Sequence, residues 1–152
     1  MHSFILKRQP KAYQGSGTFK SKLSKQNYID ALQTALTSYN VVANPYSDTE
    51  LYGIVYYFFN KNSGTDADNI SKPIWDCLKG ILFEDDKLIK LRTAGAFDLT
   101  KNDLSVIDFS GVKGEVVADM LDAFDNDDHI VYIECGALDF SMFKFNLESN
   151  GN

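Results

Sequence analysis

Residues 51–91 read LYGIVYYFFNKNSGTDADNISKPIWDCLKGILFEDDKLIKL. The first ten are apolar on both faces and rich in β-forming residues, which predicts a central strand buried on both sides. Residues 87–93 predict a second strand. Apolar residues at helical spacing between the two strands predict a helix from Pro73 to Gly80. We place its start at Pro73 because a proline disfavours helical geometry in the residue before it. We take this strand–helix–strand unit as the centre of the fold.

Further elements lie on both sides of this unit in the sequence. Residues 3–8 predict a short strand, and a helical pattern begins at Ser24, which we expect to be the N-cap. Residues 114–126 predict another helix and residues 129–140 a late strand, while residues 94–111 have the composition of a loop with a strand fragment. Helices and strands are interspersed, so the fold class is α+β or α/β.

Length and composition indicate one domain, residues 1–152, with a substantial core, since 44% of the residues are hydrophobic. No apolar run approaches the roughly 18 residues that a membrane span needs. The apolar patch at the N-terminus precedes its charges, the reverse of a signal peptide, so we expect a cytoplasmic protein. Cys77 and Cys135 lie far apart in apolar runs and are interpreted as buried thiols in preference to a disulfide.

Charge is distributed unevenly along a chain whose net charge is −6. Residues 93–152 carry a local charge of −9, whereas residues 1–29 hold six basic residues and no acid. This asymmetry indicates that the chain binds a polyanion or a partner chain. The alternative is that the lysines only solvate the protein surface. Tyr13 and Phe19 lie among these charges and either stack on opened bases or pack against the domain. The basic residues are Lys7, Arg8, Lys11, Lys20, Lys22 and Lys25.

Carboxylates are the candidate functional groups that remain after other kinds of catalytic and metal site are excluded. Two histidines and two cysteines without close spacing make neither a zinc site nor a recognisable nucleophile–histidine centre, and no phosphate-binding glycine loop is present. Asp66 and Asp68, two apart in an extended segment, would project side by side. Asp85 or Asp86 would join them if the helix packs back beside the sheet. Such oxygen ligands suit Mg²⁺ or Mn²⁺, although turn acids without a metal explain the same pattern.

The run D-A-D-N-x-x-K-P-I-x-D-x-L-x-G followed by E-D-D-x-x-I, residues 66–89, resembles the RusA family of Holliday junction resolvases, which are divalent-metal endonucleases. The two halves of the motif have the family's spacing. The opening ILKRQPKAYQ is similar to the family's N-terminus, but more weakly, and residues 93–128 match nothing in the family and are interpreted as an atypical insertion. The motif positions are Asp66, Asp68, Asn69, Lys72, Asp76, Leu78, Gly80, Asp85 and Asp86.

The resemblance implies an α+β domain with a mixed sheet flanked by helices. It also implies a homodimer that binds four-way DNA junctions and cuts one strand per protomer with Mg²⁺ or Mn²⁺, in a protein of prophage origin. Asp66, Asp68 and Asp86 would be the essential carboxylates and Lys72 the essential lysine, with Asp85 as the adjacent acid that can exchange roles with Asp86. Lys72 in an ion pair with a neighbouring aspartate is the alternative.

Two further expectations concern activity and assembly. The rival function is a catalytically inactive module that keeps the fold and binds DNA junctions or proteins, which the acidic composition favours. A two-fold junction calls for two chains, and we expect their interface to use the helix that carries Trp75 or the late strand at residues 129–140. Trp75 packed in the core is the alternative.

Overall fold

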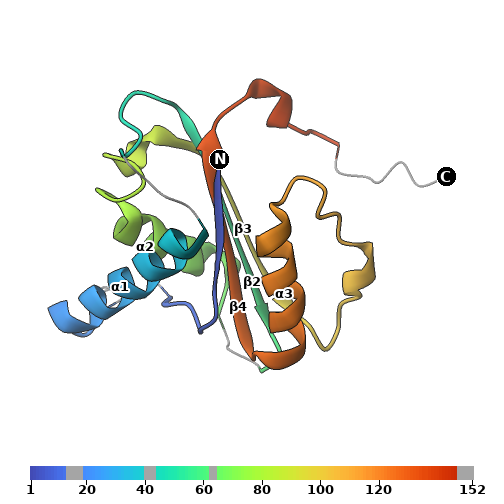
Figure 1. Ribbon diagram of the computed structural model, residues 1–152. Coiled ribbons are helices and arrows are strands. Elements are labelled where there is room, and N and C mark those ends of the chain that lie inside the picture. The colour runs from blue at the N-terminus through green and yellow to red at the C-terminus, as the bar shows by residue number, and fades with distance from the viewer. Residues whose placement is uncertain (13–18, 40–43, 62–64, 147–152) are drawn as a thin grey trace.

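The computed structural model describes residues 1–12, 19–39, 44–61 and 65–146. Within these ranges four strands form one sheet in the order β1-β4-β2-β3 (Figure 1). β4 is antiparallel to β1 and to β2, whereas β2 and β3 are parallel. The sheet is therefore mixed, which confirms the predicted α+β class. The strands are β1 (His2–Leu6), β2 (Leu51–Phe59), β3 (Ile89–Asp98) and β4 (His129–Ala137).

Helices cover both faces of this sheet. α1 (Lys22–Tyr39) and α2 (Ala67–Leu78) lie on one face, and α3 (Gly114–Asn126) lies on the other (Figure 1). Two groups of buried side chains fill the two interfaces, the larger beneath α1 and α2 and the smaller beneath α3. None of the helices in the described ranges is both long and apolar enough to cross a membrane.

β2 is the central strand that its composition predicts. Val55 and Tyr57 are fully buried in the group beneath α1 and α2, whereas Phe58 belongs to the group beneath α3. Because side chains alternate along a strand, only a run apolar at both odd and even positions can fill two cores. The prediction of a strand buried on both sides is confirmed.

α2 begins earlier than its sequence indicates. We predicted a start near Pro73, but the helix begins at Ala67 and Pro73 lies inside it. An interior proline costs about 3 kcal/mol through a lost hydrogen bond and a clash. Ile70, before the proline, and Ile74 and Trp75, after it, are all fully buried. At about 1.5–3 kcal/mol for each buried side chain, packing outweighs the proline penalty.

Two other boundaries also differ from the expectation. The Oγ of Ser21, not that of Ser24, accepts a hydrogen bond from the backbone N–H of Ser24 at 3.0 Å, so the cap of α1 lies three residues earlier than predicted. β3 extends to Asp98 because residues 94–98 pair in parallel register with the second half of β2. The small residues Ala94, Gly95 and Ala96 have low strand propensity, so the sequence does not predict this part of β3, and pairing with β2 stabilises it.

Two features named for a dimer interface are engaged within the chain itself. Trp75 is 0% exposed, so the core alternative holds for this side chain, and β4 lies between β1 and β2 with both edges hydrogen-bonded. The interface itself stays a prediction. Cys77 and Cys135 are free and buried, as predicted. Burial raises the pKa of Cys77 to about 11 and that of Cys135 to about 12, so both remain thiols at neutral pH.

Replacing Gly53 with alanine should destabilise the fold by about 1–3 kcal/mol, the usual cost of overpacking. A Cβ at this β2 position would lie 2.6 Å from Cζ2 of Trp75, whose indole is fully buried and has little room to move. Denaturant unfolding measures the loss. Gly111→Ala is the matched control, because nothing lies within 4 Å of its added Cβ. Equal stability of the two variants would contradict this packing account.

Candidate active site

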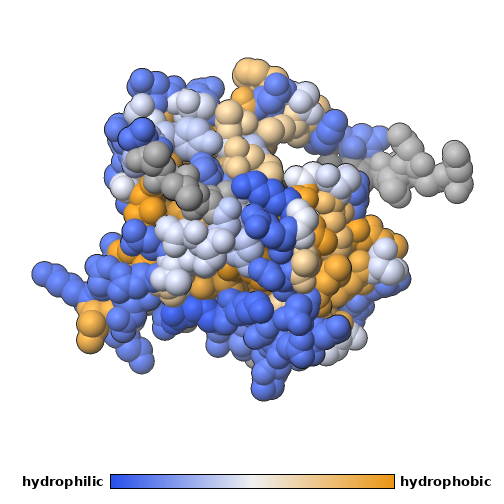
Figure 2. Space-filling model, in the orientation of Figure 1, coloured by the Kyte–Doolittle hydropathy of each residue, from blue (hydrophilic) through white to orange (hydrophobic). Residues whose placement is uncertain are grey.

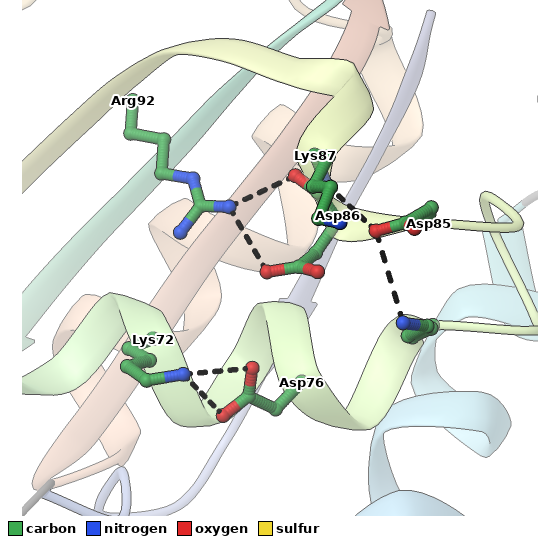
Figure 3. Close-up of polar contacts among 7 residues, drawn as sticks. Lys72, Asp76, Asp85, Asp86, Lys87 and Arg92 are labelled. Carbon is green, nitrogen blue, oxygen red and sulfur yellow. Dashed lines mark hydrogen bonds and ion pairs between the residues drawn. The ribbon is translucent and has the colours of Figure 1, made fainter. Parts of the chain in front are cut away.

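One face of α2 carries the charged residues of the motif. Asp68, Lys72 and Asp76 recur every four residues and so share a helix face, opposite the buried Ile70 and Ile74. The Nζ of Lys72 lies 3.1 Å from Oδ1 and 3.0 Å from Oδ2 of Asp76 (Figure 3). The Lys72 side chain is 50% exposed and that of Asp76 38%, so this ion pair faces solvent. The ion-pair alternative for Lys72 is thus realised in the free chain.

Asp85 lies in the turn after α2. Its Oδ1 accepts a hydrogen bond from the backbone N–H of Lys87 at 3.0 Å and lies 3.7 Å from the Nζ of Lys79. The hydrogen bond from Lys87 is the main reason that the pKa of Asp85 is lowered, with the positive charge of Lys79 contributing. The Asp85 carboxylate therefore stays ionised, and it sits at the C-terminal end of α2, where Lys79 is the C-cap.

Asp86 is held by an arginine that sequence reasoning missed. The Nη2 of Arg92 donates to the backbone carbonyl of Asp86 at 2.9 Å and lies 3.3 Å from its Oδ2 (Figure 3). A register shift in the β2–β3 pairing between Leu51 and Tyr52 inserts one extra residue into β3. Ile89 and Arg92 can therefore both face α2, although they are three residues apart. No local pattern signals this bulge, so the contact could not be read from the sequence.

Asp66 and Asp68 lie at the other end of α2. Asp66 is the N-cap in extended geometry without a side-chain cap hydrogen bond, and Asp68 stands in the first helical turn. The helix dipole favours carboxylates at this end. Because the helix starts at Ala67, Asp66 and Asp68 do not share the extended segment from which we expected them to project side by side. α2 holds 12 residues and is about 18 Å long, and it separates Asp66 from Asp85.

These carboxylates do not form a three-ligand metal centre in the described part of the chain, where no three His, Cys, Asp or Glu side chains gather closely enough to hold an ion. We expected Asp85 or Asp86 to lie at the same end of α2 as Asp66, and the structure does not show this arrangement. The structure instead places Asp68, Lys72 and Asp76 on one face of α2, and Asp86 in the turn before β3, where Arg92 contacts it. Carboxylate oxygens are the right donor type for a hard cation, but the spacing of these carboxylates does not fit one.

The basic residues of the N-terminal third divide into two sets. Lys7 faces α3, where its Nζ lies 3.7 Å from Asp122 and 3.6 Å from Asp127. The guanidinium of Arg8 stands over the ring of Tyr28, 5.3 Å from its centroid. These contacts engage both side chains within the fold. Three exposed lysines without a place in these contacts lie at and just before the start of α1, namely Lys20, Lys22 and Lys25, whereas Lys11 is partly buried.

Of the two aromatic residues expected to stack on bases or pack, Phe19 packs. Its ring lies 5.7 Å from that of Tyr28 and contacts the larger core group. Tyr13 lies outside the described residues.

Comparison with known proteins gives one positive finding. A family model described as endodeoxyribonuclease RusA matches residues 7–103, more than half of the chain. The matched span contains α1, β2, α2, β3 and the candidate site between them. A search of curated proteins finds no match.

Proposed function

The chain belongs to the RusA family of endodeoxyribonucleases, and from that premise we propose that it resolves four-way DNA junctions by hydrolysing phosphodiester bonds. The observation that carries the proposal is the charged, solvent-facing side of α2, which holds the motif residues Asp68, Lys72 and Asp76. Many surface helices carry charged residues, so this observation has weight because the row lies within the span that the family model matches. The acidic composition remains the argument for the rival, an inactive module that only binds junctions or proteins.

The proposed roles follow from residue chemistry. Asp66, Asp68 and Asp86 are the essential carboxylates, and Asp85 is the neighbour that can exchange roles with Asp86. Lys72 supplies a point charge to the scissile phosphate or its leaving oxygen, where negative charge develops. The ammonium of Lys72 is half exposed and, among the described residues, pairs with Asp76 alone, so it can reach a phosphate by rotating away from Asp76.

A divalent cation, Mg²⁺ or Mn²⁺, is proposed as the cofactor, on the basis of family membership and of a donor set made of carboxylates. Family membership names Asp66, Asp68, Asp86 and Asp85 as its ligands, but in the structure α2 separates Asp66 from Asp85, and no three acids of the described residues gather closely enough to hold one ion. When bound, such an ion activates water and neutralises phosphate charge.

Assembly and origin complete the proposal. A four-way junction has near two-fold symmetry, and its productive resolution takes two cuts in opposing strands, so one site per chain requires a homodimer. The basic segments of the two protomers would share the DNA face and the acidic C-terminal thirds would turn away from it, because like charges repel. We place this activity in the cytoplasm of a cell that carries the gene in a prophage.

The decisive experiment incubates the purified chain with a synthetic four-way junction, with Mg²⁺ and separately with EDTA. Paired nicks in opposing strands with Mg²⁺, and none with EDTA, are expected. A linear duplex of the same sequence is the control and should remain intact. Junction binding without cleavage under any divalent cation would instead support the inactive module, and cleavage in EDTA would refute the cation requirement. A monomer by light scattering with single-strand nicking would exclude paired cutting.

Replacing Lys20, Lys22 and Lys25 with alanine should weaken junction binding and flatten its salt dependence. Each lost phosphate contact lowers the slope of log affinity against log salt by up to about 0.9. Fluorescence anisotropy over roughly 50–200 mM salt measures the slope. The matched control replaces Lys101, Lys113 and Lys144, the three lysines of the acidic C-terminal part, and makes the same change in net charge. Equal slopes for both triple variants would move the DNA face elsewhere.

A further inference from the structure

A groove runs beside α3 on the sheet face opposite α2. One cavity of about 260 Å³ lies under the connection between β3 and α3, and a second of about 170 Å³ adjoins it. Tyr56, Phe58 and Ile107 line both cavities. A third hollow of about 240 Å³ shares Ile54 and Glu134 with the second and reaches Met142. We name the three together the Tyr56 groove. Figure 2 shows apolar surface gathered over α3 and the connection that precedes it.

The walls of the Tyr56 groove are aromatic and apolar. The ring of Tyr56 stacks on that of Tyr132 at 6.3 Å between centroids and meets the ring of Phe97 edge-on at 5.8 Å. Phe97 itself is 37% exposed, so part of this aromatic surface is open to solvent. Faces of such rings attract cations as well as apolar groups.

Glu134 sits among these rings as a partly buried carboxylate. The hydroxyl of Tyr52 donates to its Oε1 at 2.5 Å, and the hydroxyl of Tyr132 donates to its Oε2. Burial, followed by the contact with Glu134, raises the pKa of both tyrosines, so both stay protonated and remain donors. In the described part of the chain no Lys, Arg or His forms an ion pair with Glu134. The carboxylate is thus oriented by neutral donors, and no basic side chain of the described residues pairs with its negative charge.

The rim of the groove is also negative. Asp103 and Asp108 contribute to its lining, and hydrogen bonds from Ser105 and Ser110 lower the pKa of the two carboxyl groups. The lining contains no lysine or arginine. Phosphate groups are repelled from such a surface, which excludes DNA as its occupant. An apolar groove with aromatic walls and three carboxylates is complementary to an organic cation with an apolar body.

We propose that the Tyr56 groove binds a basic, apolar segment of a partner protein, with an arginine side chain directed at Glu134 beside the stacked rings of Tyr56 and Tyr132. Arginine combines an apolar stem with a planar guanidinium that stacks on aromatic rings and pairs with carboxylates. An extended segment suits three adjoining hollows better than one compact small molecule does. Flanking apolar side chains would occupy the cavity beside Ile107. The groove and the charged side of α2 lie on opposite faces of the sheet, so partner and DNA can bind together.

The test measures binding of a fluorescein-labelled peptide, Gly-Leu-Arg-Phe-Arg-Leu-Gly, to the full chain by anisotropy. Glu134→Gln keeps the size of the side chain but removes its charge and replaces one acceptor oxygen by a donor amide, and it should weaken binding about tenfold or more, as expected for a charged hydrogen bond. Ile107→Ser removes apolar wall on an exposed connection and should weaken binding severalfold. The matched control, Asp125→Asn, removes one exposed charge of α3 outside the groove and should change the affinity less than twofold.

Several outcomes would overturn the inference. No saturable binding of the peptide to the wild-type chain would do so, as would equal weakening by Glu134→Gln and Asp125→Asn, which would show only general attraction to an acidic protein. Binding of arginine amide as tight as that of the peptide would identify a small-cation pocket in place of a protein-docking groove. Groove-dependent self-association by light scattering would identify a second copy as the occupant. Junction cleavage by all three variants should match the wild type, and failure of the cleavage proposal would leave the peptide result unaffected.

Discussion

Replacing Asp68 with asparagine should lower the rate of junction cleavage by at least about a hundredfold, the scale of a lost acid–base or charge-stabilising group. Asp68 is exposed in the first turn of α2 and shares a helix face with Lys72. Asparagine preserves the size of the side chain but can neither accept a proton as a base nor carry its charge. Junction affinity should hold or rise, because one negative charge near the phosphates is removed.

Cleavage is measured by single-turnover gel kinetics and affinity by anisotropy, both with the same four-way junction. Asp48→Asn serves as the matched control, since Asp48 is an exposed acid outside the motif and its loss changes the net charge equally. Near wild-type cleavage by the Asp68 variant in Mg²⁺ would show that this carboxylate has no essential role. Equal loss in both variants would point to general electrostatics.

The sequence correctly predicted the elements whose pattern of apolar residues indicates which of their faces are buried. The run at 51–59 is apolar at odd and even positions and became the strand between two cores. The helix predicted at 114–126 matches α3, because its apolar stripe needs only one face of the sheet. The predicted ends of elements were wrong where tertiary contacts override local preference. Buried residues before and after Pro73 keep it inside α2, and pairing with β2 extends β3 through small residues.

For the candidate site, the sequence indicated which residues belong to the motif but not where they lie. β2 and β3 are parallel neighbours, so α2 must carry the chain from the C-terminal end of one strand to the N-terminal end of the other. That crossover places Asp66 and Asp85 at opposite ends of the helix. Strand direction is a property of the whole sheet and is absent from the local pattern. The contact between Arg92 and Asp86 depends on a bulge and was hidden for the same reason.

Replacing Lys72 distinguishes its two interpretations, a surface ion pair with Asp76 and a charge that acts on the phosphate. As a surface ion pair, Lys72 and Asp76 contribute only about 0.3–0.5 kcal/mol, and either truncation breaks the pair equally. Lys72→Ala and Asp76→Ala would then have the same small effect on unfolding and on cleavage. If Lys72 instead neutralises charge on the phosphate, its removal should lower the cleavage rate by about a hundredfold or more, whereas Asp76→Ala leaves the ammonium in place.

We therefore expect an asymmetric result, in which the two alanine variants unfold at the same denaturant concentration but only the Lys72 variant loses cleavage. Asp76→Ala frees an ammonium that the structure holds 3.0 Å from the Asp76 carboxylate, so it should retain activity and bind the junction more tightly. Lys72→Arg tests geometry, because it keeps the positive charge but spreads it over a planar fork, and partial activity is expected. Matching cleavage rates for the two alanine variants would show that the Lys72–Asp76 pair is structural, because only a role at the phosphate distinguishes the lysine from its partner.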